Sequence, residues 1–236
     1  MNRKRKVKVS VIIPTFKEGR YIENLLSRLQ RVNYPIEIIV VDGGSMDGTV
    51  ETAKRYTGKV YQLMERGISK ARNYGAQMAE GEILVFMDAD VYPPLDFPEK
   101  VLKAFRDPTV IGATCNIMPI RPKPTEKAFF KFYNRLIRIV SFFKPHSRGE
   151  FFAVRRREFM MVGGFDENLP CLEDHDLAMR ISRYGKFIFI NELTVYETMR
   201  RIRKMGLLSV VKTWLINYLF FILRGKPIAR VWHPIR

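Results

Sequence analysis

Short apolar runs rich in β-branched residues alternate with segments of helical spacing through the first half of this 236-residue chain. Runs of Val and Ile predict strands, and apolar residues spaced three and four apart predict helices. Strands that alternate with helices favour right-handed βαβ units and a mostly parallel sheet. The predicted strands cover residues 7–13, 36–41, 60–63 and 83–87, and the predicted helices cover residues 21–32, 48–56 and 69–79.

The second half is less regular, because prolines interrupt it after residue 92 and again from Pro119 to Pro124. Two further strands are predicted at residues 151–154 and 187–190, and they flank a helix from about 172 to 184. A chain of 236 residues with 47% hydrophobic content can bury one sizeable core. We therefore expect one α/β domain with appendages, whose second half covers the crevice of the first.

Carboxylates follow two of the predicted strands directly. Asp88 and Asp90, separated only by Ala89, end the fourth strand, and Asp42 ends the second. Ligands of open α/β sheets bind beyond the carboxyl ends of the strands, and oxygen ligands of this kind suit Mg²⁺ or Mn²⁺. The alternative is that these residues only start turns, which Asp does well.

Four ordered segments carry a resemblance to a known family: residues 11–18, 40–49, 86–90 and 173–177. Together they resemble the family 2 inverting glycosyltransferases, over roughly residues 7–200, with some similarity to polyprenyl- and dolichol-phosphate sugar synthases. The resemblance implies the GT-A fold of nucleotide-diphospho-sugar transferases, a Rossmann-like, mixed but mostly parallel sheet with flanking helices. The implied organisation is a basic tail (1–6), a catalytic domain (7–199) and a basic, apolar extension (200–236) with a C-terminal amphipathic helix. Within the catalytic domain, residues 7–119 would bind the nucleotide sugar and residues 120–199 the acceptor.

The resemblance also implies a donor site. Pro14, Thr15 and Glu18 would line the nucleoside pocket, and Asp42 would contact the base or ribose. Arg72 would bind the diphosphate or a base edge, for which a guanidinium fork is suited. The alternatives are an acid near a helix start for Glu18, a turn cap for Asp42 and an exposed helix position for Arg72.

The Asp88-Ala89-Asp90 segment matches the family's metal motif. Asp88 would approach the ribose or the metal, Ala89 would line the donor site, and Asp90 would be the more direct ligand of Mn²⁺ or Mg²⁺. A bound cation stabilises the charge that builds on a departing nucleoside diphosphate.

The Glu-Asp pair at residues 173 and 174 matches the family's catalytic motif. Asp174 would take the proton of an acceptor hydroxyl, and Glu173 would place the acceptor or orient Asp174. A first helical turn rich in acids, stabilised by the helix dipole, is the alternative reading, and both can hold at once. His175 stands at a position that varies in the family, and we treat it as incidental. An acceptor that is an ionised phosphate would need a base less.

The net charge of +17 is concentrated in residues 120–160 and 200–236. A helix over residues 129–140 and an apolar run over 205–223, with basic residues on both sides, suggest helices that lie in a membrane interface. Lys212 and Asn217 argue against a span of the bilayer. The predicted apolar face of the first helix comprises Phe129, Phe132, Tyr133, Leu136, Ile137 and Val140.

The expected function is metal-dependent, inverting transfer of one sugar from a UDP- or GDP-linked donor to a lipid-linked or glycan acceptor. Two cysteines without a pairing pattern fit a reducing cytosol, and the basic segments fit peripheral attachment to an anionic membrane at its cytoplasmic face. The alternatives are a non-catalytic GT-A-like protein that binds lipid or nucleic acid, and a sugar nucleotidyltransferase. Charge confined to two segments argues against nucleic acid, and the absence of a Gly-rich loop near residue 14 argues against nucleotidyl transfer.

Overall fold

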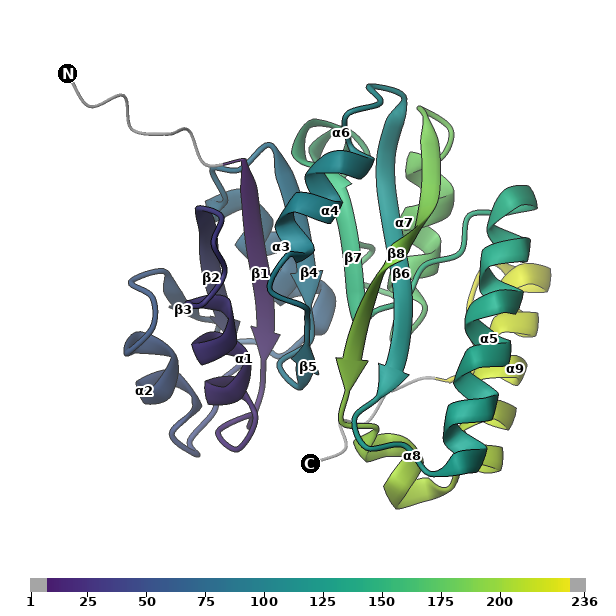
Figure 1. Ribbon diagram of the computed structural model, residues 1–236, viewed down its shortest axis with the longest axis horizontal. Coiled ribbons are helices and arrows are strands. Elements are labelled where there is room, and N and C mark those ends of the chain that lie inside the picture. The colour runs from purple at the N-terminus through teal and green to yellow at the C-terminus, as the bar shows by residue number, and fades with distance from the viewer. Residues whose placement is uncertain (1–7, 230–236) are drawn as a thin grey trace.

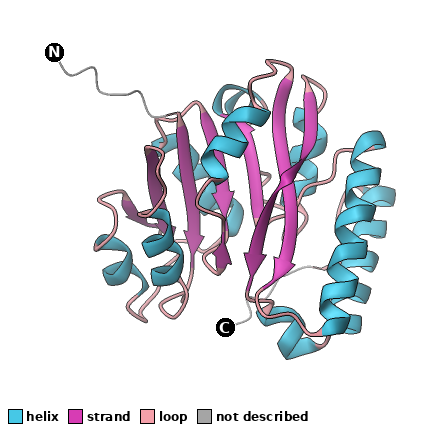
Figure 2. Ribbon diagram, viewed as in Figure 1, coloured by secondary structure: helices cyan, strands magenta, loops and turns pink. Residues whose placement is uncertain are grey.

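Residues 8–229 are described in a computed structural model, in which one mixed sheet carries helices on both faces (Figure 1, Figure 2). The predicted tail at residues 1–6 and the basic residue Arg230 lie outside the described residues. The strands are β1 (Val9–Thr15), β2 (Ile36–Asp42), β3 (Val60–Gln62), β4 (Ile83–Met87), β5 (Val91–Tyr92), β6 (Val110–Pro119), β7 (Phe151–Arg155) and β8 (Lys186–Glu197). The helices are α1 (Ile22–Leu29), α2 (Thr49–Lys54), α3 (Ile68–Met78), α4 (Phe97–Ala104), α5 (Pro124–Phe143), α6 (Arg156–Met161), α7 (Glu173–Ile181), α8 (Arg200–Met205) and α9 (Leu207–Arg224).

The strand order is β3-β2-β1-β4-β7-β6-β8-β5. The first four strands pair in parallel, as do β6 and β8, whereas β7 runs antiparallel to both of its neighbours. The amino end of β7 therefore lies at the same edge as the carboxyl ends of β1, β2, β4 and β8. The predicted mixed, mostly parallel sheet is confirmed, and this shared edge is where ligands bind in such sheets.

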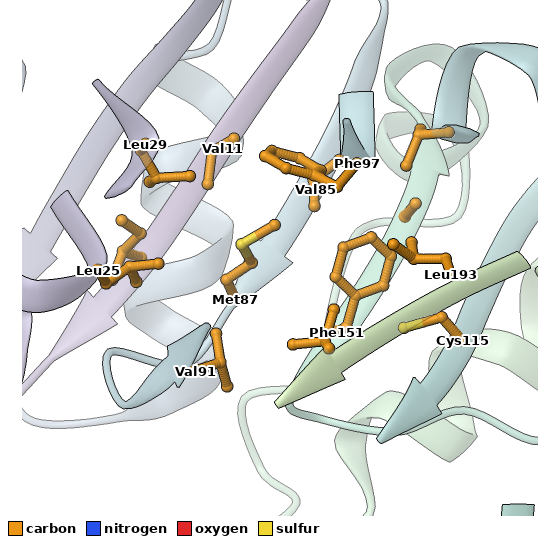
Figure 3. Close-up of a cluster of buried hydrophobic side chains, with 14 of the residues drawn as sticks. Val11, Leu25, Leu29, Val85, Met87, Val91, Phe97, Cys115, Phe151 and Leu193 are labelled. Atoms are coloured by element: carbon orange, nitrogen blue, oxygen red, sulfur yellow. The ribbon is translucent and has the colours of Figure 1, made fainter. Parts of the chain in front are cut away.

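Alternation along β1 divides the core between the two faces of the sheet. Val9, Val11 and Ile13 pack on one face with α1, and Ile12 packs on the other face with α3. Figure 3 shows the first of these clusters, which reaches across the sheet from Leu25 of α1 to Leu193 of β8. Successive side chains of a strand point to opposite faces of the sheet, so a strand that is buried on both faces contributes to two clusters.

Close packing of α3 on β1 depends on one glycine. A Cβ at Gly75 would lie 2.5 Å from Cγ2 of Ile12 and 3.2 Å from Cγ2 of Val41. No real Cβ approaches another carbon so closely, so glycine sets the distance between this helix and the sheet.

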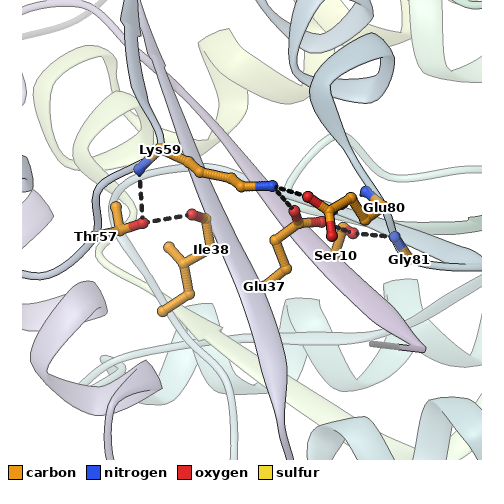
Figure 4. Close-up of polar contacts among 7 residues, drawn as sticks. All are labelled: Ser10, Glu37, Ile38, Thr57, Lys59, Glu80 and Gly81. Atoms are coloured by element: carbon orange, nitrogen blue, oxygen red, sulfur yellow. Dashed lines mark hydrogen bonds and ion pairs between the residues drawn. The ribbon is translucent and has the colours of Figure 1, made fainter. Parts of the chain in front are cut away.

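Polar side chains close the opposite, amino-terminal edge of the sheet (Figure 4). The buried carboxylate of Glu37 accepts hydrogen bonds from the Ser10 hydroxyl and Lys59, and Glu80 donates its backbone N–H to it at 2.9 Å. Lys59 also pairs with Glu80 at 2.6 Å. Burial opposes the ionisation of Glu37, but the hydrogen bonds outweigh burial and lower its pKa.

The helix predicted around residues 129–140 is present as α5, and of its predicted apolar face only Ile137 is fully buried. The side chains that α5 buries are Glu126, Phe130, Asn134 and Ile137, whereas Phe132 and Leu136 are exposed. Asn134 can be buried because its side-chain amide pairs with the backbone of one residue of β6. It donates to the Ile117 carbonyl at 2.9 Å and accepts from the Ile117 N–H at 3.2 Å.

The apolar run predicted at residues 205–223 forms α9, and Gly206, with φ of +83°, separates it from α8. Helices α5 and α9 lie side by side at one end of the sheet (Figure 1), where Tyr133 stacks on Trp214 with ring centroids 6.1 Å apart. By length and composition α9 could cross a bilayer, and 17% of its 18-residue span is buried.

Candidate active site

The acids predicted from the sequence lie at one edge of the sheet, but they are held in two groups. The first group surrounds Arg200, and the second surrounds Arg72. Both arginines lie largely inside the protein, with 16% and 1% of their side chains exposed. Each guanidinium joins carboxylates from segments that are far apart in the sequence.

The Asp42 carboxylate accepts hydrogen bonds within the turn that follows β2. Its carboxylate accepts from the N–H groups of Gly44 and Ser45 at 2.9 and 2.7 Å, and from the Ser45 and Thr15 hydroxyls at 2.6 and 3.0 Å. Four acceptor positions are all that a carboxylate offers. The turn role weighed for Asp42 is therefore realised, and Thr15 is drawn into it. A donor contact by Asp42 would have to replace one of these hydrogen bonds, and it stays a prediction. Pro14 lies one residue earlier in β1, partly buried opposite Val41.

Arg200, at the start of α8, joins the ends of β1 and β4. Its Nη1 lies 3.0 Å from Oε2 of Glu18, and its Nε lies 2.7 Å from Oδ2 of Asp90. The Thr198 hydroxyl donates to the same Asp90 oxygen. Burial opposes the charge of Arg200, but Asp90 and Glu18 raise its pKa. Arg200 lies 110 positions after Asp90 in the sequence, and the structure places its guanidinium directly on that carboxylate.

Asp88 and Ala89 take different positions. Asp88 keeps 34% of its side chain exposed, whereas Ala89 is buried in the hydrophobic core. The Ala89 side chain packs with the core, and its role in lining the donor site stays a prediction. Burial raises the pKa of Asp88 to about 7, with Arg72 opposing the shift and Asp90 adding to it. Burial also raises the pKa of Glu197 well above its usual value, and Glu150, Asp90 and Asp88 reinforce that effect.

Carboxylates that lie this close together repel one another. A bound divalent cation would offset their negative charge, and carboxylate oxygens are ligands that Mg²⁺ and Mn²⁺ prefer. Among residues 8–229, no three His, Cys, Asp or Glu side chains converge to hold a metal alone. Magnesium and manganese usually take one or two carboxylates together with substrate phosphates and waters. Asp88 and Asp90 therefore suffice as the protein's share of such a site.

Arg72, in α3, joins the metal motif to the catalytic motif. Its Nη1 donates to Oε1 of Glu173 at 2.7 Å, and its Nη2 donates to Oδ1 of Asp88 at 3.0 Å and to the Gly149 carbonyl at 2.9 Å. The exposed helix position weighed for Arg72 is wrong, because 1% of this residue is exposed. Its guanidinium is occupied by protein groups, and the contact with a diphosphate stays a prediction.

Glu173 and Asp174 begin α7, as the acidic first turn predicts, but both are buried. Burial raises the pKa of Glu173 despite the nearby charge of Arg72. Burial acts the same way on Asp174, but His175 and Arg72 outweigh it and bring the pKa of Asp174 to about 2. Asp174 is therefore ionised at neutral pH and can accept a proton.

Two histidines, His175 and His146, lie beside Asp174. His175 Nδ1 lies 3.0 Å from Oδ1 of Asp174, and His175 Nε2 lies 3.0 Å from Nε2 of His146. The treatment of His175 as incidental is wrong, because its ring binds the predicted base directly. No local pattern could reveal the partner, since His146 is 29 positions away.

Comparison with known proteins identifies the family of the chain. Residues 10–163 match the profile of the family Glycosyl transferase family 2, and residues 120–217 match Glycosyltransferase like family 2. A dolichol-phosphate mannosyltransferase of Pyrococcus furiosus is 39% identical over 110 residues, which cover 43% of this chain and 31% of that protein. The aligned part spans a third or less of each of the first curated relatives.

Solved structures show the same fold. The mannosyltransferase PcManGT of Pyrobaculum calidifontis, in complex with GDP-Man and Mn²⁺, superposes with a TM-score of 0.70 at 26% identity, covering 90% of this chain and 65% of that one. TarS 1-349 of S. aureus in complex with UDP-GlcNAc gives a TM-score of 0.65 at 20% identity and covers 93% of this chain and 76% of that one. The family profile extends over more than half of the chain, from β1 to the Gly163 turn. The chain belongs to glycosyl transferase family 2, and it has the GT-A fold.

Proposed function

We propose that this enzyme transfers one sugar, with inversion and with Mn²⁺ or Mg²⁺, from a UDP- or GDP-linked donor to a lipid-linked or glycan acceptor at the cytoplasmic face of a membrane. The observation that carries the proposal is the buried link Asp88–Arg72–Glu173, which holds the end of the metal strand beside the start of the catalytic helix. Relatives that bind GDP-Man with Mn²⁺ or UDP-GlcNAc support the donor class.

Asp88 and Asp90 would hold the cation, which when bound stabilises the negative charge on the leaving nucleoside diphosphate. Arg200 holds Oδ2 of Asp90 at 2.7 Å. This guanidinium holds the Asp90 carboxylate in one orientation before the donor arrives.

Asp174 would act on the acceptor. A bond forms between the acceptor oxygen and the anomeric carbon while the bond from that carbon to the diphosphate breaks on the opposite face, and the hydroxyl proton passes to Asp174. With a pKa of about 2, Asp174 is a weak base. It suits a late proton transfer, after the attacking oxygen has gained positive charge.

The membrane part of the proposal rests on the outer surface of α5 and α9. Exposed apolar side chains line both helices there: Phe132, Leu136, Ile139 and Phe143 on α5, and Leu208, Leu215, Leu219 and Leu223 on α9. Exposed basic residues, Lys131, Arg135, Lys212 and Arg224, lie on the same two helices. Burial of a large apolar side chain contributes roughly 1.5–3 kcal/mol, and each basic residue near anionic lipid adds about 1 kcal/mol. Lys212 in the middle of α9 favours a helix that lies on the membrane over one that crosses it.

A donor screen tests the function. UDP-, GDP- and dTDP-sugars are incubated with Mn²⁺ or Mg²⁺, with and without polyprenyl phosphate, and nucleotide release is measured. Release from one donor that needs both metal and acceptor supports the proposal. Formation of a nucleotide sugar from a sugar phosphate and a nucleoside triphosphate would instead identify a nucleotidyltransferase.

Vesicle flotation tests the attachment. We expect the protein to float with vesicles that contain anionic lipid and the double variant Phe132→Glu, Leu215→Glu to remain at the bottom. Met64→Glu is the matched control, because Met64 is fully exposed but lies away from α5 and α9. Equal flotation of all three proteins would contradict the assignment of this surface.

A further inference from the structure

Two histidine rings, which the family motif does not include, lie on one side of the predicted base, Asp174. His175 Nδ1 lies 3.0 Å from Oδ1 of Asp174, and the Nε2 atoms of His175 and His146 lie 3.0 Å apart. The two rings meet edge to face, with centroids 4.1 Å apart and an interplanar angle of 89°.

A tyrosine of α9, Tyr218, packs against both histidine rings. The ring of Tyr218 lies 5.5 Å from both histidine rings, measured between centroids. His146 is 7% exposed, and the His175 side chain is 12% exposed. The buried Nδ1 of His146 has no hydrogen-bond partner among the described residues.

These contacts fix where the protons lie. Burial, reinforced by His175, lowers the pKa of His146 to about 2, so His146 is neutral. If His175 is neutral, His146 donates its Nε2–H to Nε2 of His175, and only a lone pair remains at the unpartnered His146 Nδ1. If His175 is charged, it donates to His146 instead, and a buried N–H is left without a partner. In both arrangements His175 carries a proton on Nδ1 and donates it to Asp174.

The opposite oxygen of Asp174, Oδ2, lies near Gly149, and 9% of the Asp174 side chain is exposed. A Cβ added to Gly149 would lie 3.8 Å from Oδ2 of Asp174 and 3.6 Å from Nη2 of Arg72, with no other heavy atom near it. The absence of a side chain at Gly149 therefore leaves room beside Oδ2, whereas Oδ1 is covered by His175.

We propose that His175, supported by His146 and Tyr218, is a positioning residue that fixes the Asp174 carboxylate so that Oδ2 receives the acceptor's proton. This inference rests on the proposed role of Asp174. The charged and titratable groups that act on the pair are Asp174 and Glu173 of α7, Arg72 of α3, Arg148 before β7 and Tyr218 of α9. Through Tyr218, the helix proposed to lie on the membrane also forms a wall of the base's surroundings.

The kinetic test compares His175→Leu with His175→Asn, because the Asn amide can place an N–H near the position of Nδ1. We expect kcat to fall about 10- to 100-fold in His175→Leu with an unchanged donor KM, and to recover to within about 3-fold of wild type in His175→Asn. Tyr218→Ala should lower kcat while Tyr218→Phe retains it. Tyr184→Leu, an exposed tyrosine after α7, is the control and should match wild type.

The pH dependence of kcat distinguishes a positioning role of His175 from a general loss of stability. Loss of His175 leaves burial less opposed, so the pKa of Asp174 rises from about 2. The acidic limb of kcat should therefore move to higher pH in His175→Leu, whereas a merely destabilised enzyme would keep its limb.

Nitrogen-15 NMR provides a readout that needs no substrate. The chain has three histidines, and His146→Gln and His233→Gln assign their signals. We expect a protonated Nδ1 on His175 that shifts in Asp174→Asn, and this measurement applies even if His175→Leu fails to fold.

Wild-type kcat and an unchanged pH profile in His175→Leu, with Asp174→Asn inactive, would overturn the inference and leave the proposed function in place. Wild-type turnover in Asp174→Asn would overturn both the inference and the proposed role of Asp174 as the base, while sugar transfer itself would stand.

Discussion

At the amino ends of the strands, Lys59 lies between two carboxylates, Glu37 and Glu80, whereas at the carboxyl ends Arg72 lies between Asp88 and Glu173. The arrangements look alike, but their electrostatics differ. Hydrogen bonds overcome burial at Glu37 and lower its pKa, while burial wins at Asp88 and Glu173 and raises theirs.

The difference shows which end is complete without a ligand. At the amino end the hydroxyl of Ser10 and a backbone N–H supplement the ion pair, so the negative charge of Glu37 is fully compensated. At the carboxyl end burial and the nearby acids Glu150, Asp90 and Asp88 raise the pKa of Glu197 well above its usual value, which indicates a deficit of positive charge there. Such a deficit raises pKa values at functional sites, where a cation or substrate supplies the missing charge.

The strongest test of this contrast removes a carboxylate at the deficient end. Asp90→Ala should lower metal-dependent transfer by roughly 1,000-fold, because a bound cation supplies several kcal/mol of transition-state stabilisation. The thermal unfolding midpoint should change little, since Arg200 keeps its partner Glu18. Added Mn²⁺ should raise this midpoint in the wild type and not in the variant.

Asp96→Ala is the control for this variant. Asp96 is exposed and pairs with Lys100 along α4, so its loss should leave turnover unchanged. Full activity in Asp90→Ala with the same donor and metal would remove Asp90 from the metal site.

The reverse pattern is expected at the amino end. Glu37→Gln should lower the free energy of unfolding by about 1–3 kcal/mol, because it weakens hydrogen bonds to a buried ionised group. Glu80→Gln, at a side chain that is 70% exposed, should cost under about 1 kcal/mol. Denaturant unfolding measures both, and both variants should transfer sugar at the wild-type rate. A loss of turnover in Glu37→Gln without a loss of stability would break the division of roles between the two edges.

The sequence predicts features that depend on neighbouring residues, and it does not predict contacts between residues that are far apart in the chain. Strands β1, β2 and β4 and the acids at their ends follow from local patterns, because strand period and the position of Asp88 and Asp90 are read within a few residues. Strand β6 was not predicted, because Gly112 and Asn116 interrupt its apolar pattern. The structure explains Gly112, since a Cβ there would meet the Phe187 ring at 2.6 Å.

The partners of the acids could not be predicted. Arg200 is 110 positions from Asp90, and His146 is 29 positions from His175. The buried face of α5 could not be predicted for the same reason, since it includes Asn134, which is polar but finds its partners on β6. Tertiary hydrogen bonds of this kind override the helical pattern on which the prediction depended.

The smallest expected effect is on the pH dependence of stability. Because the pKa of Glu37 is lowered in the folded protein, its contribution is present above the ordinary value of 4.5 and is lost as pH falls below it. Glu173, with its raised pKa, acts in the opposite sense, and its contribution is lost as pH rises through the folded value. The difference in unfolding free energy between wild type and Glu37→Gln should therefore shrink below pH 4.5, by at most about 1.4 kcal/mol per pH unit. Urea titrations at a series of pH values measure it, and a difference that stays constant through this range would show that the Glu37 charge is not what stabilises the amino-terminal edge.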